Sequence, residues 1–86
     1  MQTKHECYFS HRTDCLDQHH VMNGAFRSKS DKYGLWVYLH HDVHMYLHHT
    51  SDGQQMAVEL KKKAQKAFEE RYGHDLWMKE FHKNYI

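Results

Sequence analysis

The chain has no proline, only four glycines and only two cysteines among its 86 residues. No internal repeat or low-complexity linker is visible, so the chain is expected to be continuous, without a hinge between separate domains. A chain of this length has room for one small hydrophobic core, which predicts a single domain over residues 1–86. The two cysteines, Cys7 and Cys15, allow at most one disulfide.

Long apolar runs are absent as well. No stretch approaches the roughly 20 apolar residues of a membrane span, and the N-terminal MQTKHECYF lacks the apolar region of a signal peptide. We therefore expect a cytoplasmic protein that makes no membrane contact and keeps both cysteines reduced. The formal net charge is only +1, which argues against nucleic-acid binding by bulk electrostatics but allows local basic contacts.

Histidine is what the chain has in excess, with 11 residues of this type. Hydrophobic residues make up 40% of the sequence, so the chain can fold but has little stability to spare, and such small chains often depend on a metal, a disulfide or a partner. The segment LDQHHVMNG, residues 16–24, sets His19 beside His20. In a chain so rich in histidine, this pair alone is weak support for a functional site.

The hydrophobic pattern predicts two short strands near the middle of the chain. Residues 15–21 form a short extended stretch, and LWVYL, residues 35–39, is aromatic and β-branched, as strands are. Between them, residues 23–34 are predicted to be a loop, because Asn-Gly favours positive φ and no apolar period follows.

Helices are predicted after the strands. Asp42 is the predicted N-cap of the first helix, and Ser-Asp-Gly at 51–53 is expected to end it and cap the next. The clearest helix covers residues 53–73 and stops at Gly73. Its apolar stripe is formed by Met56, Leu60, Ala64, Ala67 and Phe68. A final short helix is predicted within residues 74–86, with Leu76, Trp77 and Phe81 available for packing. This order predicts an α+β fold.

Helical spacing supplies partners for the histidine pair. His44 and His48 are four residues apart, so they share one face of the predicted helix. A helical His-x3-His can bind one metal ion from that face. Two strands, the first ending in His-His, followed by such a helix are the layout of a ββα-metal nuclease site.

On these residues the chain resembles the HNH (His-Me finger, ββα-metal) endonucleases. More closely, it is similar to small phage and prophage proteins related to the RecA-dependent recombination-enhancement nuclease. The resemblance covers roughly residues 5–86 and rests on CYFSHRTDCLDQHHVMNG, RSKSDKYGLWVYLHHDVH and the tail from LKKKAQKAFEERYG to KNYI. It implies a ββα-metal core over about residues 5–50 and a C-terminal helical extension over about 53–86, with two helices.

The resemblance also implies an activity and a location. The chain would be a divalent-metal-dependent DNA endonuclease or nickase, phage- or prophage-encoded, acting in the cytoplasm of a bacterial host cell. His20 matches the family's general base, and the metal ligands are matched by His19, His44 and His48. Three imidazole ligands would suit zinc, nickel or manganese, and magnesium would be a poorer match because it prefers oxygen. The central Asn of the HNH motif has no convincing counterpart, and Asn23 is not assigned to it.

A further departure concerns the structural zinc that many relatives hold on two Cys-x2-Cys pairs. The four corresponding positions here are Cys7, Ser10, His40 and Val43. We therefore predict no four-cysteine structural zinc, with aromatic side chains packing in its place, namely Tyr8, Phe9, Trp36 and Tyr38. The alternative is a zinc held by Cys7 and His40 with His11 or Cys15.

Basic residues in the predicted loop are candidates for DNA contact. Arg27, Lys29 and Lys32 are expected to meet phosphates, because Arg and Lys position the backbone without reading sequence. The other interpretation is an ordinary solvated loop.

Two other functions stay open. One is a catalytically weak or inactive binding module of the same fold, acting as a recombination accessory factor or as an inhibitor of a host defence protein. The other is metal storage or sensing by a histidine-rich chain. The joint presence of His19, His20, His44 and His48 favours an enzyme or at least a metal site. Cutting both strands of duplex DNA would favour a homodimer.

Overall fold

The computed structural model describes all residues, 1–86, and combines α-helices with a two-stranded antiparallel sheet. The elements in chain order are β1 (Leu16–His20), the 3-10 helix η1 (Gly24–Phe26), α1 (Arg27–Lys32), β2 (Trp36–His40), α2 (His41–His49), α3 (Ser51–Tyr72) and α4 (His74–Phe81). The predicted α+β class is confirmed, and both strands lie within a residue of their predicted positions. None of the helices has the length and apolar character needed to cross a membrane.

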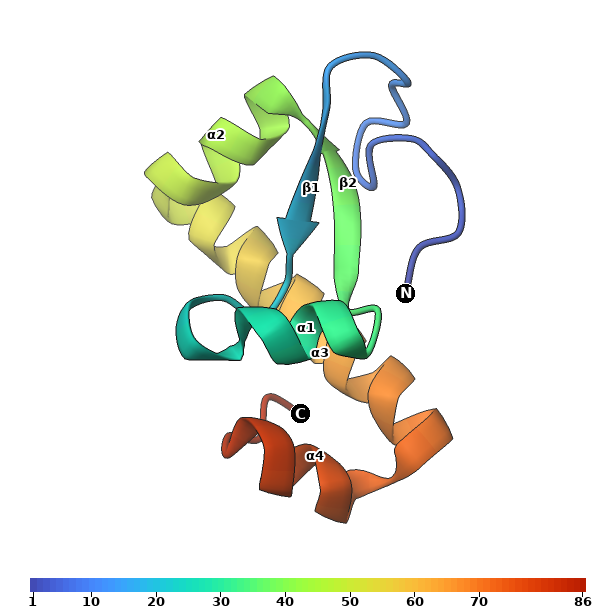
Figure 1. Cartoon of the computed structure of the whole chain (residues 1–86). Helices are drawn as coiled ribbons and strands as arrows, with labels where there is room; N and C mark the ends of the chain where they lie inside the picture. Colours follow the sequence, from blue (N-terminus) through green and yellow to red (C-terminus); the bar gives the residue numbers. More distant parts are fainter.

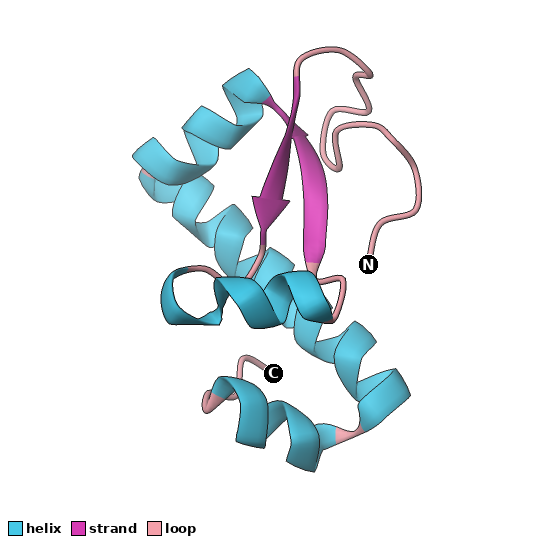
Figure 2. Cartoon of the chain, viewed as in Figure 1, coloured by secondary structure: helices cyan, strands magenta, loops and turns pink.

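The two-stranded ribbon lies at the centre of the molecule. Figure 1 shows α2 and the first part of α3 on one side of the ribbon and the N-terminal segment on the other. The helix α1 crosses at the lower ends of the strands, and α3 continues behind it toward α4. Figure 2 shows that the chain before β1 forms a long loop without regular structure. The helix α4 lies beyond α1, and the C-terminus returns toward the space between these two helices (Figure 1).

The strand register separates the two neighbouring histidines. His19 pairs with Val37, and His20 pairs with Trp36. Because side chains alternate along a strand, these two pairs lie on opposite faces of the ribbon. Val37 is fully buried and Trp36 is half-buried, so His19 lies on the core face and His20 on the other.

The segment predicted as a loop is mostly helical, so that prediction is wrong. Residues 24–32 form η1 and α1, which have no apolar period of their own and are held by tertiary contacts. The Ser30 hydroxyl is buried, donates to the carbonyl oxygen of Leu35 and accepts from the N–H of Met22. Lys29 donates to the backbone oxygen of Glu80 in α4 at 2.9 Å. These contacts outweigh weak local propensity.

Both predicted helix caps are displaced toward the N-terminus. The helix α2 begins at His41, and its N-cap is His40, where Asp42 was predicted. The imidazole of His40 accepts the backbone N–H of Asp42 at 3.2 Å. The helix α3 is capped by Thr50, whose hydroxyl accepts the N–H of Gly53 at 2.9 Å. Gly53 is therefore inside α3, and its missing Cβ permits close packing: an added Cβ would lie 2.1 Å from the Tyr46 carbonyl oxygen.

The core forms where α3 packs against α2 at one end and against α4 at the other, beside the ribbon. Leu60, Ala64 and Phe68 of the predicted stripe are buried, Met56 is half-buried and Ala67 is exposed, which corrects the stripe at that position. Trp77 and Phe81 of α4 are buried, as predicted, with ring centroids 4.3 Å apart. A buried polar residue, Gln65, was not anticipated. Its amide donates to Asn84 at 2.6 Å and accepts the Tyr85 N–H at 2.6 Å, which fixes the C-terminal segment.

Aromatic side chains pack in two pairs around the N-terminal segment. Tyr8 contacts Phe9 with ring centroids 5.3 Å apart, and Trp36 contacts Tyr38 at 5.1 Å. The N–H of Tyr8 donates to the carbonyl oxygen of Tyr38 at 2.8 Å, which ties this segment to β2. Cys7 is fully buried among them, in the region where the resemblance places a zinc.

Candidate metal centre

Three histidines from two elements converge beside the ribbon. His19 comes from the core face of β1, and His44 and His48 come from one face of α2. Each offers one ring nitrogen, and these nitrogens all lie within 4.8 Å of one another. The Nε2 atoms of His44 and His48 are 3.1 Å apart. His19 is buried, His44 half-buried and His48 exposed, so the cluster opens toward solvent at His48.

The carboxylate of Asp17 orients His44, one histidine of this cluster. Asp17 Oδ2 lies 3.0 Å from Nδ1 of His44 and 2.9 Å from Nδ1 of His41. Hydrogen bonds from His44 and His41 hold the pKa of Asp17 below its ordinary value, so the group is a carboxylate that can only accept. The proton of neutral His44 therefore lies on Nδ1, which leaves the Nε2 lone pair facing His48 and the centre of the cluster.

Burial keeps His19 neutral. Desolvation, with smaller contributions from the charges of His44 and His48, lowers the pKa of His19 from 6.5 to about 4. Desolvation and the nearby His44 also lower the pKa of His48. A metal ion binds the neutral imidazole, so no proton has to leave His19 at neutral pH before it can act as a ligand.

The donor set fits a divalent transition metal. Three neutral imidazoles suit zinc, which bonds histidine nitrogen at about 2.0–2.1 Å in tetrahedral sites. Such bonds place ligand nitrogens about 3.3–3.4 Å apart, close to the observed 3.1 Å between His44 and His48. The hydrogen bond from Nδ1 of His44 to Asp17 is the outer contact that metal-binding histidines ordinarily make. The residues therefore fit the cation that the resemblance implies.

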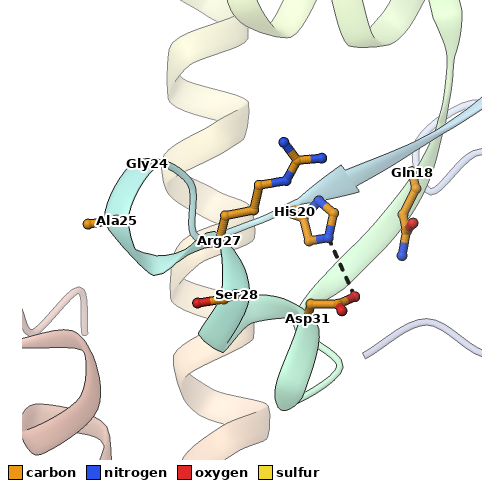
Figure 3. Close-up of a pocket in the computed structure, with 7 residues that line it drawn as sticks. All are labelled: Gln18, His20, Gly24, Ala25, Arg27, Ser28 and Asp31. Atoms are coloured by element: carbon orange, nitrogen blue, oxygen red, sulfur yellow. Dashed lines mark ion pairs between the residues drawn. The ribbon is translucent and has the colours of Figure 1, made fainter.

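His20 lies outside the metal cluster, in an adjoining pocket. Figure 3 shows its imidazole between the carboxylate of Asp31 and the guanidinium of Arg27, with the strand residue Gln18 alongside. Asp31 Oδ1 is 3.5 Å from Nε2 of His20. This carboxylate favours a proton on Nε2, which leaves the lone pair of Nδ1 able to accept a proton. The pocket has a volume of about 570 Å³.

One continuous hollow connects the two parts. A second pocket, of about 280 Å³, is lined by residues of both, including His19, His20, Arg27 and His48. Asn23 and Gly24 also line it. A ligand seated there would lie beside residues of the metal cluster as well as beside His20 and Arg27.

The three basic residues predicted to contact DNA are placed differently. Arg27 lines both pockets. Lys29 is bound to Glu80, by its hydrogen bond to the backbone and by an ion pair of 3.4 Å with the carboxylate. Lys32 lies over the ring of Tyr33 at 5.3 Å. Arg27 is therefore the basic residue of this set that the fold brings to His20.

The sequence interpretation missed the carboxylates that support the site. Asp17 precedes His19 by two residues, so strand alternation puts both on the same face, and this signal was present in the sequence. Asp31 reaches His20 only because residues 27–32 are helical. Lys61 of α3 also lines a pocket together with His19 and His48. Lys61 is far from these residues in the sequence, so the sequence alone did not predict that they lie together.

Cysteine does not contribute to the histidine cluster. Both cysteines are free, so the chain has neither a disulfide nor a four-cysteine site. A separate group of metal-binding side chains does exist and consists of Asp14, Cys15 and His40.

The geometry defines a small α+β protein with a candidate metal centre beside an antiparallel ribbon. No protein-family model matches the chain, and searches of curated proteins and of solved structures found no match.

Asp17 is expected to act as a positioning residue for the cluster. Replacing Asp17 with Asn keeps the size of the side chain but removes its charge, which weakens its hold on the Nδ1–H tautomer of His44. We expect Asp17→Asn to lower zinc affinity about tenfold, at the low end of the range for outer-shell partners of metal ligands. Chelator competition in Cys15→Ser protein would measure this affinity without a thiolate ligand.

Asp75→Asn is the matched control, because it makes the same charge change in the exposed first turn of α4. Equal zinc affinity in Asp17→Asn and Asp75→Asn would contradict the positioning role.

Proposed function

We propose that this chain is a divalent-metal-dependent DNA endonuclease or nickase of the HNH-like class, with a ββα-metal core. One observation carries the proposal: His19, His44 and His48 converge on one point, while His20 lies outside that group in the same hollow, beside Arg27. Metal-dependent phosphodiester hydrolysis uses a metal ligand set and a separate base that lie beside one pocket.

The cation would supply a Lewis acid for a phosphate oxygen and for the leaving oxygen. The rest of the chemistry falls to the chain's own residues. Arg27 is placed to hold a phosphate by charge and hydrogen bonding. His20 takes a proton from water through Nδ1 while Asp31, on the Nε2 side, stabilises the imidazolium that forms. The water oxygen bonds to phosphorus, the bond from phosphorus to the 3′ oxygen breaks, and the 3′ oxygen leaves as an alkoxide that takes a proton from solvent.

DNA fits this arrangement better than a small phosphate ester does. The hollow is open and polar, and none of the residues that line its central pocket is hydrophobic. Such a surface suits an extended phosphate backbone, which is recognised by charge and hydrogen bonding. The low net charge, +1, makes the expected binding local and weak.

The direct test is cleavage of supercoiled plasmid by purified protein with zinc, nickel, manganese or magnesium. We expect nicked or linear DNA with at least one of these cations, at a rate that EDTA abolishes. His44→Ala removes one of the three proposed metal ligands, and this variant is expected to be inactive at the same cation concentration. If the parent binds the cations but cleaves with none of them, the proposal fails and the binding-module alternative is favoured.

A further inference from the structure

A second set of metal-binding side chains lies at the end of the ribbon away from His20. Asp14, Cys15 and His40 each offer one ligand atom, and these atoms all lie within 4.8 Å of one another. We propose that Asp14, Cys15 and His40 form a second cation site, independent of the histidine cluster, that takes zinc in preference to magnesium or calcium.

The backbone brings the three ligands together where two chain segments meet. Cys15 adopts a left-handed conformation, with φ of 49°, directly before β1 begins. Its carbonyl oxygen accepts the N–H of His41 at 2.9 Å, and the next residue, Leu16, pairs with His40. The start of β1 is thereby fixed against the junction of β2 and α2, so the site does not depend on a flexible loop closing over the cation.

His40 is the most constrained of the three ligands. His40 is only 5% exposed, and its Nδ1 accepts the N–H of Asp42 at 3.2 Å. Its Nε2 faces Asp14 Oδ2 at 3.9 Å, which is too long for a hydrogen bond. Because no side-chain nitrogen or oxygen is both buried and without a partner, Nε2 keeps some contact with solvent.

Cation binding at Nε2 would require a change of tautomer. In neutral His40 the proton lies on Nε2, since Nδ1 is an acceptor. A cation at Nε2 displaces this proton to Nδ1, and His40 then gives up the hydrogen bond from the Asp42 N–H. Asp42 Oδ2, now 3.8 Å from Nδ1, must move closer to accept the new N–H. A carboxylate behind the histidine is the usual support for a zinc ligand.

The donor set selects the cation. A thiolate, an imidazole and a carboxylate suit zinc, whereas magnesium and calcium prefer oxygen ligands throughout. Zinc bonds of about 2.0–2.2 Å to nitrogen and oxygen place these two ligand atoms about 3.3–3.6 Å apart, so the observed 3.9 Å requires a contraction of a few tenths of an ångström. Arg12 already binds both carboxylate oxygens of Asp14, at 3.0 and 2.7 Å. That pair is exposed and bidentate, so Asp14 must exchange its contact with Arg12 for the cation.

This set differs from the zinc positions that the resemblance implies. The set shares His40 with those four positions, and it shares His40 and Cys15 with the alternative zinc considered above. Cys7, which both of those sites include, lies outside the group. Cys7 is buried and its sulfur already accepts the N–H of Ser10 at 3.4 Å. A cation on Asp14, Cys15 and His40 would join the two segments that precede β1 and α2, and so stabilise a fold with a small core.

Cobalt(II) is the probe for this site, because a cobalt–thiolate bond gives a near-ultraviolet charge-transfer band that imidazole and carboxylate ligands do not give. We expect the full chain to develop this band. The band is expected to reach its maximum when one cobalt ion per chain occupies the site that contains the Cys15 thiolate. His48→Ala is expected to keep the band and Cys15→Ser to lose it. Cys15 is exposed, so this substitution is compatible with folding. Asp14→Asn is expected to weaken cobalt binding at this site by about tenfold or more, whereas the matched Asp75→Asn leaves it unchanged.

Four results would overturn the proposal. The first is a parent protein without the band, and the second is a band that survives Cys15→Ser. The third is saturation at half a cobalt per chain, which would place the ion between two copies of the protein. Equal cobalt affinity in Asp14→Asn and Asp75→Asn would remove Asp14 from the ligand set and so also contradict the three-ligand site.

Discussion

We expect His20→Ala to lower the rate of DNA cleavage by about 10²–10⁴-fold, the contribution typical of a general base. His20 is not a member of the histidine cluster, so the same substitution is expected to leave cation affinity unchanged. The two readouts separate a residue that moves a proton from one that holds the metal. Plasmid cleavage under single-turnover conditions measures the first, and chelator competition measures the second.

His49→Ala is the matched control for this experiment. His49 is an exposed histidine of α2 that belongs to neither group of metal-binding side chains. Its replacement is expected to leave both the cleavage rate and cation affinity unchanged. Equal cleavage by the parent and by His20→Ala would remove the role of His20 and point to a contaminating nuclease. Loss of cation affinity in His20→Ala would instead make His20 part of the metal site.

The geometry of the metal cluster was largely predictable because it depends on short-range periodicity. A four-residue spacing puts His44 and His48 on one helix face whatever the helix packs against. A strand that ends in His-His must point one imidazole to each face of the ribbon. Only the meeting of His19 with α2 needed the tertiary fold, and it follows from α2 packing on the core face.

The surroundings of His20 were less predictable because they depend on long-range contacts. Residues 27–32 have little helical pattern, and Ser30 and Lys29 hold them in place through Leu35 and the distant Glu80. Without that helix the sequence does not bring Asp31 to His20. The helix caps differ from the prediction for the same reason. Asp42 was predicted because Asp is a preferred N-cap residue, but His40 caps α2 because it lies at the end of β2.

A pH dependence of stability follows from the burial of His19 as a neutral imidazole. Its pKa is about 4 in the folded chain and near the ordinary 6.5 when unfolded. Between these values the unfolded state binds more protons than the folded state, so stability falls as pH decreases from about 6.5 to 4. Above 6.5 the group contributes nothing to this dependence. At about 1.4 kcal/mol per pKa unit, the expected loss of unfolding free energy by pH 4 is about 3 kcal/mol.

Urea unfolding in EDTA at a series of pH values between 7 and 4 would measure this loss without bound cation. The comparison is with His19→Asn, which removes the titrating group and is expected to flatten the dependence by about 3 kcal/mol. His49→Asn removes an exposed histidine and is expected to keep the full dependence. A His19→Asn protein as sensitive to acid as the parent would contradict a neutral, buried His19. It would also weaken the metal site, because a charged imidazole at that position cannot act as a ligand until it loses its proton.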